Sequence, residues 1–244
     1  MSLYINSKTN TLRMAIFDIR IRIFKAIDDQ DSCESFMEGH TNVLKIYGVT
    51  QVTSGRKEWF SNPDAYVIVA GSIETGEMVG GIRAHVANKT HPLPLVEAIE
   101  KVDPSIIKFV DQLAVEGTGE ICGLWNSRTV KGMGISIMLM RAVIAILPQL
   151  RLKTFLGLCA PHTYESLKKL GYVVIPSLGN NGTFYYPKED LVATAIMIHD
   201  PESIATSDEY DKTIVMDLRN NLKQHKIELG PLGEINVDYD LNIK

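Results

Sequence analysis

The sequence is poor in cysteine. Its three cysteines, Cys33, Cys122 and Cys159, include no C-x-x-C pair. An odd and widely spaced set excludes a disulfide framework and a zinc ribbon. Histidine and the acidic residues also lack a metal-ligand spacing, so we expect no bound metal.

Long apolar runs are also missing. The most apolar stretch, residues 135–150, is interrupted by Arg141 and is too short to span a bilayer as a lone helix. The first residues, MSLYINSKTNTLR, lack the apolar core of a secretory signal. We therefore expect a cytoplasmic protein that makes no contact with membranes.

The chain has no excess of basic charge. It carries 25 Lys and Arg against 29 Asp and Glu, a formal net charge of −4, which excludes a dedicated nucleic-acid binder. Hydrophobic residues make up 45% and charged residues 22%, which excludes global disorder. The sequence contains neither the G-x-x-x-x-G-K-[ST] loop of P-loop proteins nor a G-x-G-x-x-G after a strand, the mark of a Rossmann site.

What is present is an alternation of strands and helices, which specifies an α/β layer with a crossover between parallel neighbours. The periodicity of apolar residues predicts strands at 65–72, 78–86, 120–126, 154–160, 172–175 and 193–198, and helices within 35–52, 96–110, 135–147 and 162–170.

Residues 14–26 fit two patterns. Ile19, Ile21 and Ile23 alternate with arginines as in a strand, while other isoleucines of the segment suit a helix face. We favour a helix because the acidic stretch 28–32, a loop or a new helix start, follows it.

Asp200-Pro201 ends the main pattern. We assign residues 1–200 to one domain and residues 201–244 to a C-terminal extension packed on it, because an independent domain of that length would be marginal. The extension is predicted to hold a helix at 208–224 and a terminal strand at 234–243. The alternative for the extension is a partner-binding role, including formation of a homodimer.

The most informative segment is the strand EICGLWN, the turn at 127–134 and the apolar helix that follows. A glycine-containing turn at a helix start exposes backbone N–H groups that favour a phosphate. Gly132 and Gly134 would let a ligand approach the backbone, and Lys131 or Arg128 would add charge. The alternative is a tight turn whose glycines serve geometry alone.

At this segment the chain resembles the GNAT acyltransferase superfamily. Residues 129–134, TVKGMG, fill the frame of that family's (Gln/Arg)-x-x-Gly-x-(Gly/Ala) loop, and residues 162–172 are similar to its fourth helix, which typically ends in KLGF. The turn at 73–81 is also typical. The resemblance covers residues 14–198 in element order. It implies a central mixed, mostly antiparallel sheet flanked by helices.

A narrower resemblance links the chain to the acyl-homoserine-lactone synthases and related N-acyl amino acid synthases. It rests on Arg22-Ile-Phe24, on Gly80-Gly81-Ile82-Arg83 followed by Pro92 and Pro94, and on Ser127-Arg128. In this sequence Trp125 and Asn126 precede the Ser-Arg pair, where the lactone synthases carry an acidic residue.

The resemblance implies direct transfer of an acyl group from acyl-CoA or an acyl carrier protein to the amine of a small molecule or amino acid. A backbone N–H near residues 124–126 would hold the oxyanion, and the same strand edge would bind the pantetheine arm. The expected donor-binding residues are Leu124, Trp125, Asn126, Arg128, Lys131, Gly132, Met133, Gly134 and Ile135.

Two residues are our catalytic candidates. Glu120 begins the strand, and burial beside apolar groups would raise its pKa into the range of a working base; the alternative is a solvated strand-end carboxylate. Leu167 stands where many relatives carry a tyrosine that acts as general acid, so we assign that role to the nearby Tyr164, with Tyr172 as a second substitute. Thr129 replaces the usual Gln or Arg of the loop, and Arg128 would supply that charge.

Arg83 could hold a substrate carboxylate through a bidentate contact, although a surface ion pair is the favoured alternative. His85 and His91 are interpreted as polar surface residues, and Cys159 as a small buried one, because a covalent thiol route would need a histidine such as His162 beside it. The function expected from these residues is N-acyl transfer; the alternative is a non-catalytic sensor that keeps the cleft.

Overall fold

The computed structural model describes residues 17–49 and 56–243. In this part of the chain ten strands form one sheet in the order β6-β8-β5-β4-β3-β2-β1-β10-β9, and β7 pairs with β8. The strands are β1 (Phe17–Lys25), β2 (Ala65–Ser72), β3 (Met78–Val86), β4 (Thr118–Asn126), β5 (Thr154–Cys159), β6 (Val173–Val174), β7 (Thr183–Tyr185), β8 (Val192–Ile198), β9 (Lys223–Gly230) and β10 (Gly233–Asp240).

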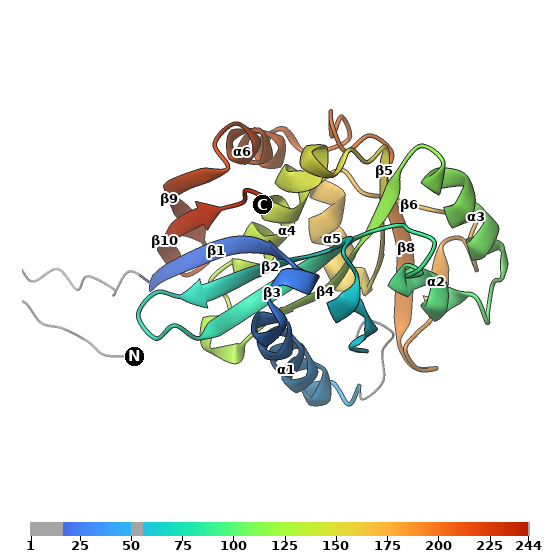
Figure 1. Cartoon of the computed structure of the whole chain (residues 1–244), viewed down its shortest axis with the longest axis horizontal. Helices are drawn as coiled ribbons and strands as arrows, with labels where there is room; N and C mark the ends of the chain where they lie inside the picture. Colours follow the sequence, from blue (N-terminus) through green and yellow to red (C-terminus); the bar gives the residue numbers. More distant parts are fainter. Residues whose placement is uncertain (1–16, 50–55, 244) are drawn as a thin grey trace, which may run out of the picture.

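Helices cover both faces of this sheet (Figure 1). One face packs against α4 (Ile135–Ile146), α5 (Pro161–Lys169) and α6 (Glu209–Asn220) in the largest apolar core. The opposite face packs against α1 (Gln30–Ile46) in one cluster, and against α2 (Pro94–Ile99) and α3 (Ser105–Ala114) in a second. The mixed, mostly antiparallel sheet flanked by helices that we expected is therefore confirmed.

Helix α4 is buried because of its composition. Its sequence, ISIMLMRAVIAI, has no polar face, and ten of its twelve residues are buried between strands β2 to β4 on one side and α6 on the other. The helix links β4 to its parallel neighbour β5, as the crossover prediction required. Arg141 is its one charged residue, and it too is buried.

The prediction of a helix at residues 14–26 is wrong where the structure describes the segment. Phe17–Lys25 is the strand β1, which lies between β2 and β10. The alternation decides the outcome, because it buries Ile19, Ile21 and Ile23 on one face and leaves the arginines on the other. The helix start proposed for 28–32 is confirmed, since Asp29 caps α1 by accepting a hydrogen bond from the Ser32 N–H (3.0 Å).

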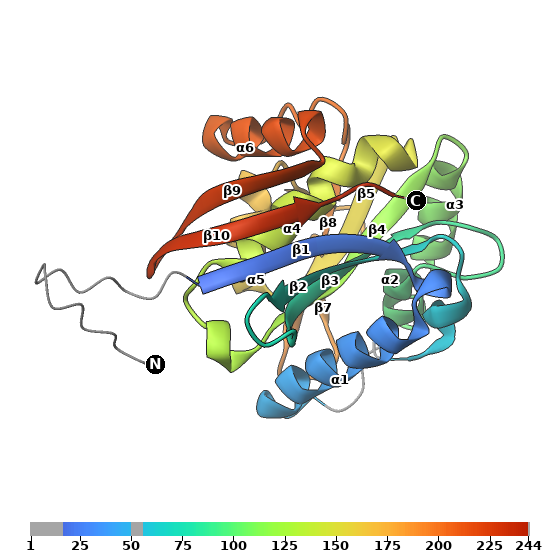
Figure 2. The same ribbon diagram turned by 60° about the vertical axis from the view of Figure 1, so that its left-hand side comes forward.

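The extension, residues 201–244, adds α6, β9 and β10 to the main body, and Figure 2 shows β9, β10 and β1 side by side. Its helix ends at Asn220, not at 224 as predicted, and the strand β9 was missed. The strand escapes detection because its pattern is inverted: Ile227 and Leu229 are exposed, whereas Glu228 is buried. Strand β10 pairs in parallel with β1, so β10 and β9 extend the sheet on the far side of β1 from β2.

Candidate active site

Strand β4 leaves its neighbour β5 partway along its length. The two strands pair in parallel only from Thr118 to Ile121 on β4, although β4 continues to Asn126. The departure coincides with a bulge, because Gly81 and Arg83 of β3 face Trp125 and Cys122, which lie three residues apart on β4. Gly123 lies in this bulge with φ +64°. The backbone of residues 122–126 of β4 is therefore not paired with β5, although the first half of the strand is.

The predicted oxyanion and pantetheine segment lies on this unpaired edge of β4. Leu124 and Asn126 are half-buried, and the Asn126 side chain accepts a hydrogen bond from the Ser136 hydroxyl of α4 (2.5 Å). The Trp125 side chain is buried beneath α1, where its ring packs directly on Gly39. Only the backbone of Trp125 is therefore available to a donor at the strand edge.

The predicted phosphate loop joins β4 to α4. After a short 3₁₀ turn at Arg128–Val130, the loop carries Gly132 and Gly134 with φ +81° and +84°, and Gly134 is the N-cap of α4. Among the described residues no side chain caps this helix start. Ile137 is the first helix residue whose N–H bonds to the Gly134 carbonyl oxygen, so the N–H groups of Ile135 and Ser136 lack an intrahelical acceptor. Arg128 and Lys131 are exposed beside it. The arrangement favours an anion.

At both loop glycines, other residues lie against the position that a Cβ would occupy. A side chain at Gly132 would meet Leu232, and one at Gly134 would meet Gly230 and Pro231. Gly230 is the last residue of β9, and the other two lie in the turn between β9 and β10. Of the other predicted donor residues, Ile135 is buried and Met133 is half-buried. A donor phosphate would thus contact the backbone N–H groups of the loop and not the space beside its glycines.

Glu120 is buried on the sheet face that α1 and α2 cover. Only 2% of it is exposed, and its Oε2 accepts a hydrogen bond from the Leu95 N–H (2.8 Å). Burial raises the pKa of Glu120 from 4.5 to about 8, against the lowering effects of the Leu95 hydrogen bond and of Arg83. The solvated-carboxylate alternative is therefore wrong, and the predicted rise in pKa is confirmed.

Arg83 is fully buried, so its interpretation as part of a surface ion pair is wrong. It lies on β3 opposite Cys122, and its guanidinium carbon is 4.0 Å from the centre of a ring of Trp59 and 5.5 Å from that of Phe36. Stacking on aromatic faces stabilises a cation that has left water. Burial nevertheless lowers the pKa of Arg83.

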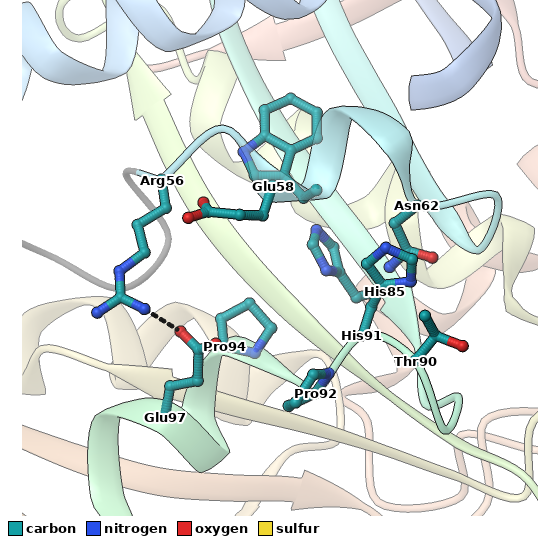
Figure 3. Close-up of a pocket in the computed structure, with 10 residues that line it drawn as sticks. Arg56, Glu58, Asn62, His85, Thr90, His91, Pro92, Pro94 and Glu97 are labelled. Atoms are coloured by element: carbon teal, nitrogen blue, oxygen red, sulfur yellow. Dashed lines mark hydrogen bonds and ion pairs between the residues drawn. The ribbon is translucent and has the colours of Figure 1, made fainter.

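His85 is also buried, which corrects its assignment to the surface. It is the cross-strand partner of Glu120, and burial, with the nearby charges of Arg83 and His91, places its pKa well below the ordinary value. The ring lines a cavity of about 230 Å³, together with Trp59, His91, Pro94 and Glu97. In Figure 3 the labelled side chains converge on this space, which the Arg56–Glu97 ion pair (3.2 Å) borders.

Several buried polar atoms surround this region. Within the described residues, the indole nitrogens of Trp59 and Trp125, Nδ1 of His40 and Nε2 of His85 have no hydrogen-bond partner. Buried groups of this kind ordinarily find partners, and an indole N–H can only donate. Of these residues Trp59 and His85 line the cavity, whereas Arg83 is fully buried beside the ring of Trp59. Trp59 and His40 were missed from the sequence, where only the rarity of tryptophan could have drawn attention to Trp59.

The remaining candidates lie around α5. Tyr164 is half-buried against the main core, and Leu167 is buried in it. Tyr172 is fully buried, and its hydroxyl has no hydrogen-bond partner among the described residues. Burial raises the pKa of Cys159 to about 12, and His162 is exposed. Cys159 is half-buried against the main core, so it is less buried than predicted.

Two further properties concern the described residues alone. None of their helices is both long and apolar enough to cross a membrane. They also contain no group of three or more His, Cys, Asp or Glu side chains that could hold a metal ion.

A sheet that opens between β4 and β5, followed by an uncapped helix start, is the arrangement expected of a GNAT-type acyltransferase fold. Solved structures have a similar overall fold. The chain is similar to FeeM, an N-acyl amino acid synthase from uncultured soil microbes, with 14% identity, 78% of this chain and 95% of that one covered, and a TM-score of 0.57.

It is also similar to two CoA-dependent acyl-homoserine lactone synthases. For BjaI, with SAM and isopentyl-CoA, the identity is 18%, the coverage 83% and 90%, and the TM-score 0.54. For MesI the identity is 15%, the coverage is 82% of this chain and 95% of that one, and the TM-score is 0.55. No family model matches the chain, and no curated protein does. At these identities the likeness establishes the fold, and it agrees with the fold and branch expected from the sequence.

Proposed function

We propose that this protein is an N-acyltransferase that moves an acyl group from acyl-CoA or an acyl carrier protein to the amine of a small molecule or amino acid. The observation that carries this proposal is Glu120, a buried carboxyl group whose pKa is raised to about 8. It lies next to the open edge of β4 and behind the wall of the cavity that His85 and Pro94 line. The solved structures of similar fold are described as acyl-transferring synthases.

In the proposed reaction the ionised Glu120 takes a proton from the acceptor ammonium. The free amine attacks the thioester carbonyl carbon, and a new C–N bond forms. A backbone N–H of residues 124–126 holds the oxyanion. The C–S bond then breaks, and the leaving thiolate takes a proton from Tyr164. Tyr164 recovers a proton from the nitrogen of the new amide, and Glu120 releases its proton to solvent. A base with a pKa near the working pH suits this task.

We further propose that the acceptor carries a carboxylate that faces Arg83. The Arg83 guanidinium carbon lies 4.0 Å from the centre of a ring of Trp59, which lines the cavity. A guanidinium and an indole N–H are both donors, and such a pair suits a carboxylate. Lysine at position 83 would keep the charge and lose the planar stacking. We expect Arg83→Lys to raise the acceptor KM and to leave the donor KM unchanged, with the exposed pair residue Arg20→Lys as the control.

The donor is tested first, by thermal unfolding with coenzyme A, acetyl-CoA and a long-chain acyl-CoA. A ligand that binds only the folded chain stabilises it by about 2.7 kcal/mol at one hundred times its Kd. We expect a shift with acyl-CoA, after which thiol release with a panel of amines and amino acids identifies the acceptor. If no CoA compound shifts the transition, acyl carrier protein becomes the donor to assay. Absence of turnover with either donor would contradict the proposal.

A further inference from the structure

The turn between β9 and β10 packs on the predicted phosphate loop. Gly230 lies so close to the Met133 carbonyl oxygen that a Cβ at position 230 would overlap with it. Leu232 covers Gly132 from the same side: a Cβ placed on Gly132 would lie 3.2 Å from Leu232 Cδ1. The tip of the C-terminal hairpin, Gly230–Leu232, therefore forms one wall of the loop.

This hairpin is held in place by buried charges. Arg141 of α4 donates a hydrogen bond from Nε to Asp211 of α6 (2.8 Å), and its guanidinium lies 3.8 Å from Glu228 of β9. Tyr239 of β10 donates a hydrogen bond to the same Glu228 (3.1 Å). Helix α4, which begins at the loop, is thereby joined to both strands of the hairpin. The tip packs on the loop that precedes α4, and Arg141 joins the second half of the same helix to the hairpin strands.

We propose that the C-terminal hairpin is a positioning element of the donor site, and that its tip holds residues 131–134 in the conformation that binds the donor phosphate. This inference rests on the proposed function. Two loop glycines have positive φ, and backbone N–H groups bind an anion only when they point to a common place. Without the contacts of residues 230–232, the N–H groups of the loop would no longer point to a common place. The edge of β4 that is proposed to bind pantetheine would be unchanged.

The test is Gly230→Ala. Gly230 does not have a positive φ, so alanine is compatible with the backbone. The main perturbation is the overlap with Met133, and a smaller one is a contact of 3.3 Å with Ile235 Cδ1. The matched control is Gly71→Ala, also in a strand, where the new Cβ would lie 3.6 Å from its nearest neighbour, an ordinary contact. A second pair is Leu232→Ala, with Leu229→Ala as the control, because Leu229 is exposed on the same hairpin.

The probes are coenzyme A, 4′-phosphopantetheine and pantetheine, and Kd is measured for each. We expect Gly230→Ala to weaken binding of the two phosphate-bearing probes about 10- to 100-fold, the effect of a lost hydrogen bond to a charged group. Pantetheine binding stays at the wild-type value. Leu232→Ala shifts the Kd values in the same direction, and both controls behave as the wild type.

Equal weakening of all three probes would overturn the inference, since it indicates general damage. Unchanged binding of coenzyme A by a folded Gly230→Ala variant would do the same. If Gly230→Ala does not fold, Leu232→Ala decides by the same criteria. A wild-type chain that binds none of the probes overturns the proposed donor site, and this inference with it.

Discussion

At the scale of single residues, burial changes what Glu120 can do. A carboxyl group with a pKa of about 8 in the folded chain and 4.5 when unfolded holds a proton in the folded state that the unfolded state releases. Between these two values the folded protein binds more protons, so stability falls as the pH rises. The same residue that serves the proposed reaction therefore destabilises the fold at neutral pH.

We expect Glu120→Gln to remove this destabilisation at neutral pH. The contribution of Glu120 to stability is fully present below pH 4.5 and is lost through pH 8, by up to about 1 kcal/mol per pH unit. The glutamine variant should thus be more stable than the wild type at pH 7 to 8 and equal to it near pH 4. Thermal unfolding across this range measures the difference.

The same variant should lose transferase activity by about 10²- to 10⁴-fold, the usual contribution of a general base. In the wild type kcat should rise with pH up to about 8, the pKa of Glu120. The matched control is Glu97→Gln, because Glu97 is half-buried in the cavity wall. A Glu120→Gln variant with full activity would remove Glu120 from the mechanism.

At the scale of elements, α1 is fitted to the sheet through a glycine. Gly39 faces the ring of Trp125, and three atoms of that ring occupy the place of a side chain. Helix propensity alone favours alanine at this position by about 1 kcal/mol. Overpacking opposes it at a cost of about 1–3 kcal/mol, and here a rigid ring blocks the site.

We therefore expect Gly39→Ala to lower the free energy of unfolding despite the better helix former. The chain has two tryptophans, so a shift in fluorescence emission reports locally on the displacement of Trp125. The exposed neighbour Glu38→Ala, on the same helix, should change stability by less than about 0.5 kcal/mol. A Gly39→Ala variant more stable than the wild type would contradict the packing described here.

The elements also show what a sequence can predict. Strands β2, β3 and β5 and helix α4 are recognisable because each is a continuous or periodic apolar run that can only be buried. The strand β1 was misread because its isoleucines satisfy two periods at once. The strand β9 was missed because it turns a carboxylate inward, towards an arginine 87 positions earlier in the chain, Arg141.

Some residues of the candidate site could be predicted from the sequence, and others could not. The loop at 131–134 and Glu120 follow from local order: a strand, a glycine turn and an apolar helix. Burial of Arg83 and His85 does not, because it depends on α1 and on the short 3₁₀ helix with Trp59, which come from a distant part of the chain. Alternation along β3 placed the two side chains on one face but could not show that this face would be covered.

At the scale of the whole molecule, the buried pair of Arg141 with Asp211 fastens the extension to the main body (2.6 Å). Glu228 is buried beside them. Removal of one partner leaves the others charged without compensation, which typically costs about 3–5 kcal/mol. We expect Arg141→Met to destabilise the protein by this amount.

Chemical unfolding at pH 7 measures this loss. Arg20→Met is the control, since Arg20 is 62% exposed and lies 3.8 Å from Asp238, and exposed pairs contribute about 0–1 kcal/mol. An Arg141→Met variant as stable as the wild type would show that the three charges do not hold the extension.

The parallel pairing of β1 with β10 has a consequence for the nascent chain during translation. About 200 residues separate the two strands, and a ribosome adding about 5–20 residues per second needs roughly 10 to 40 s to bridge them. Throughout that interval the outer edge of β1 has no partner, and an unpaired edge invites pairing with other chains. The ion-pair partner of Arg20, Asp238, lies on β10, so before β10 is made Arg20 adds an uncompensated positive charge beside this edge, which opposes pairing with a second copy. Translation that stops before β10 releases a molecule in which this edge of β1 is unpaired.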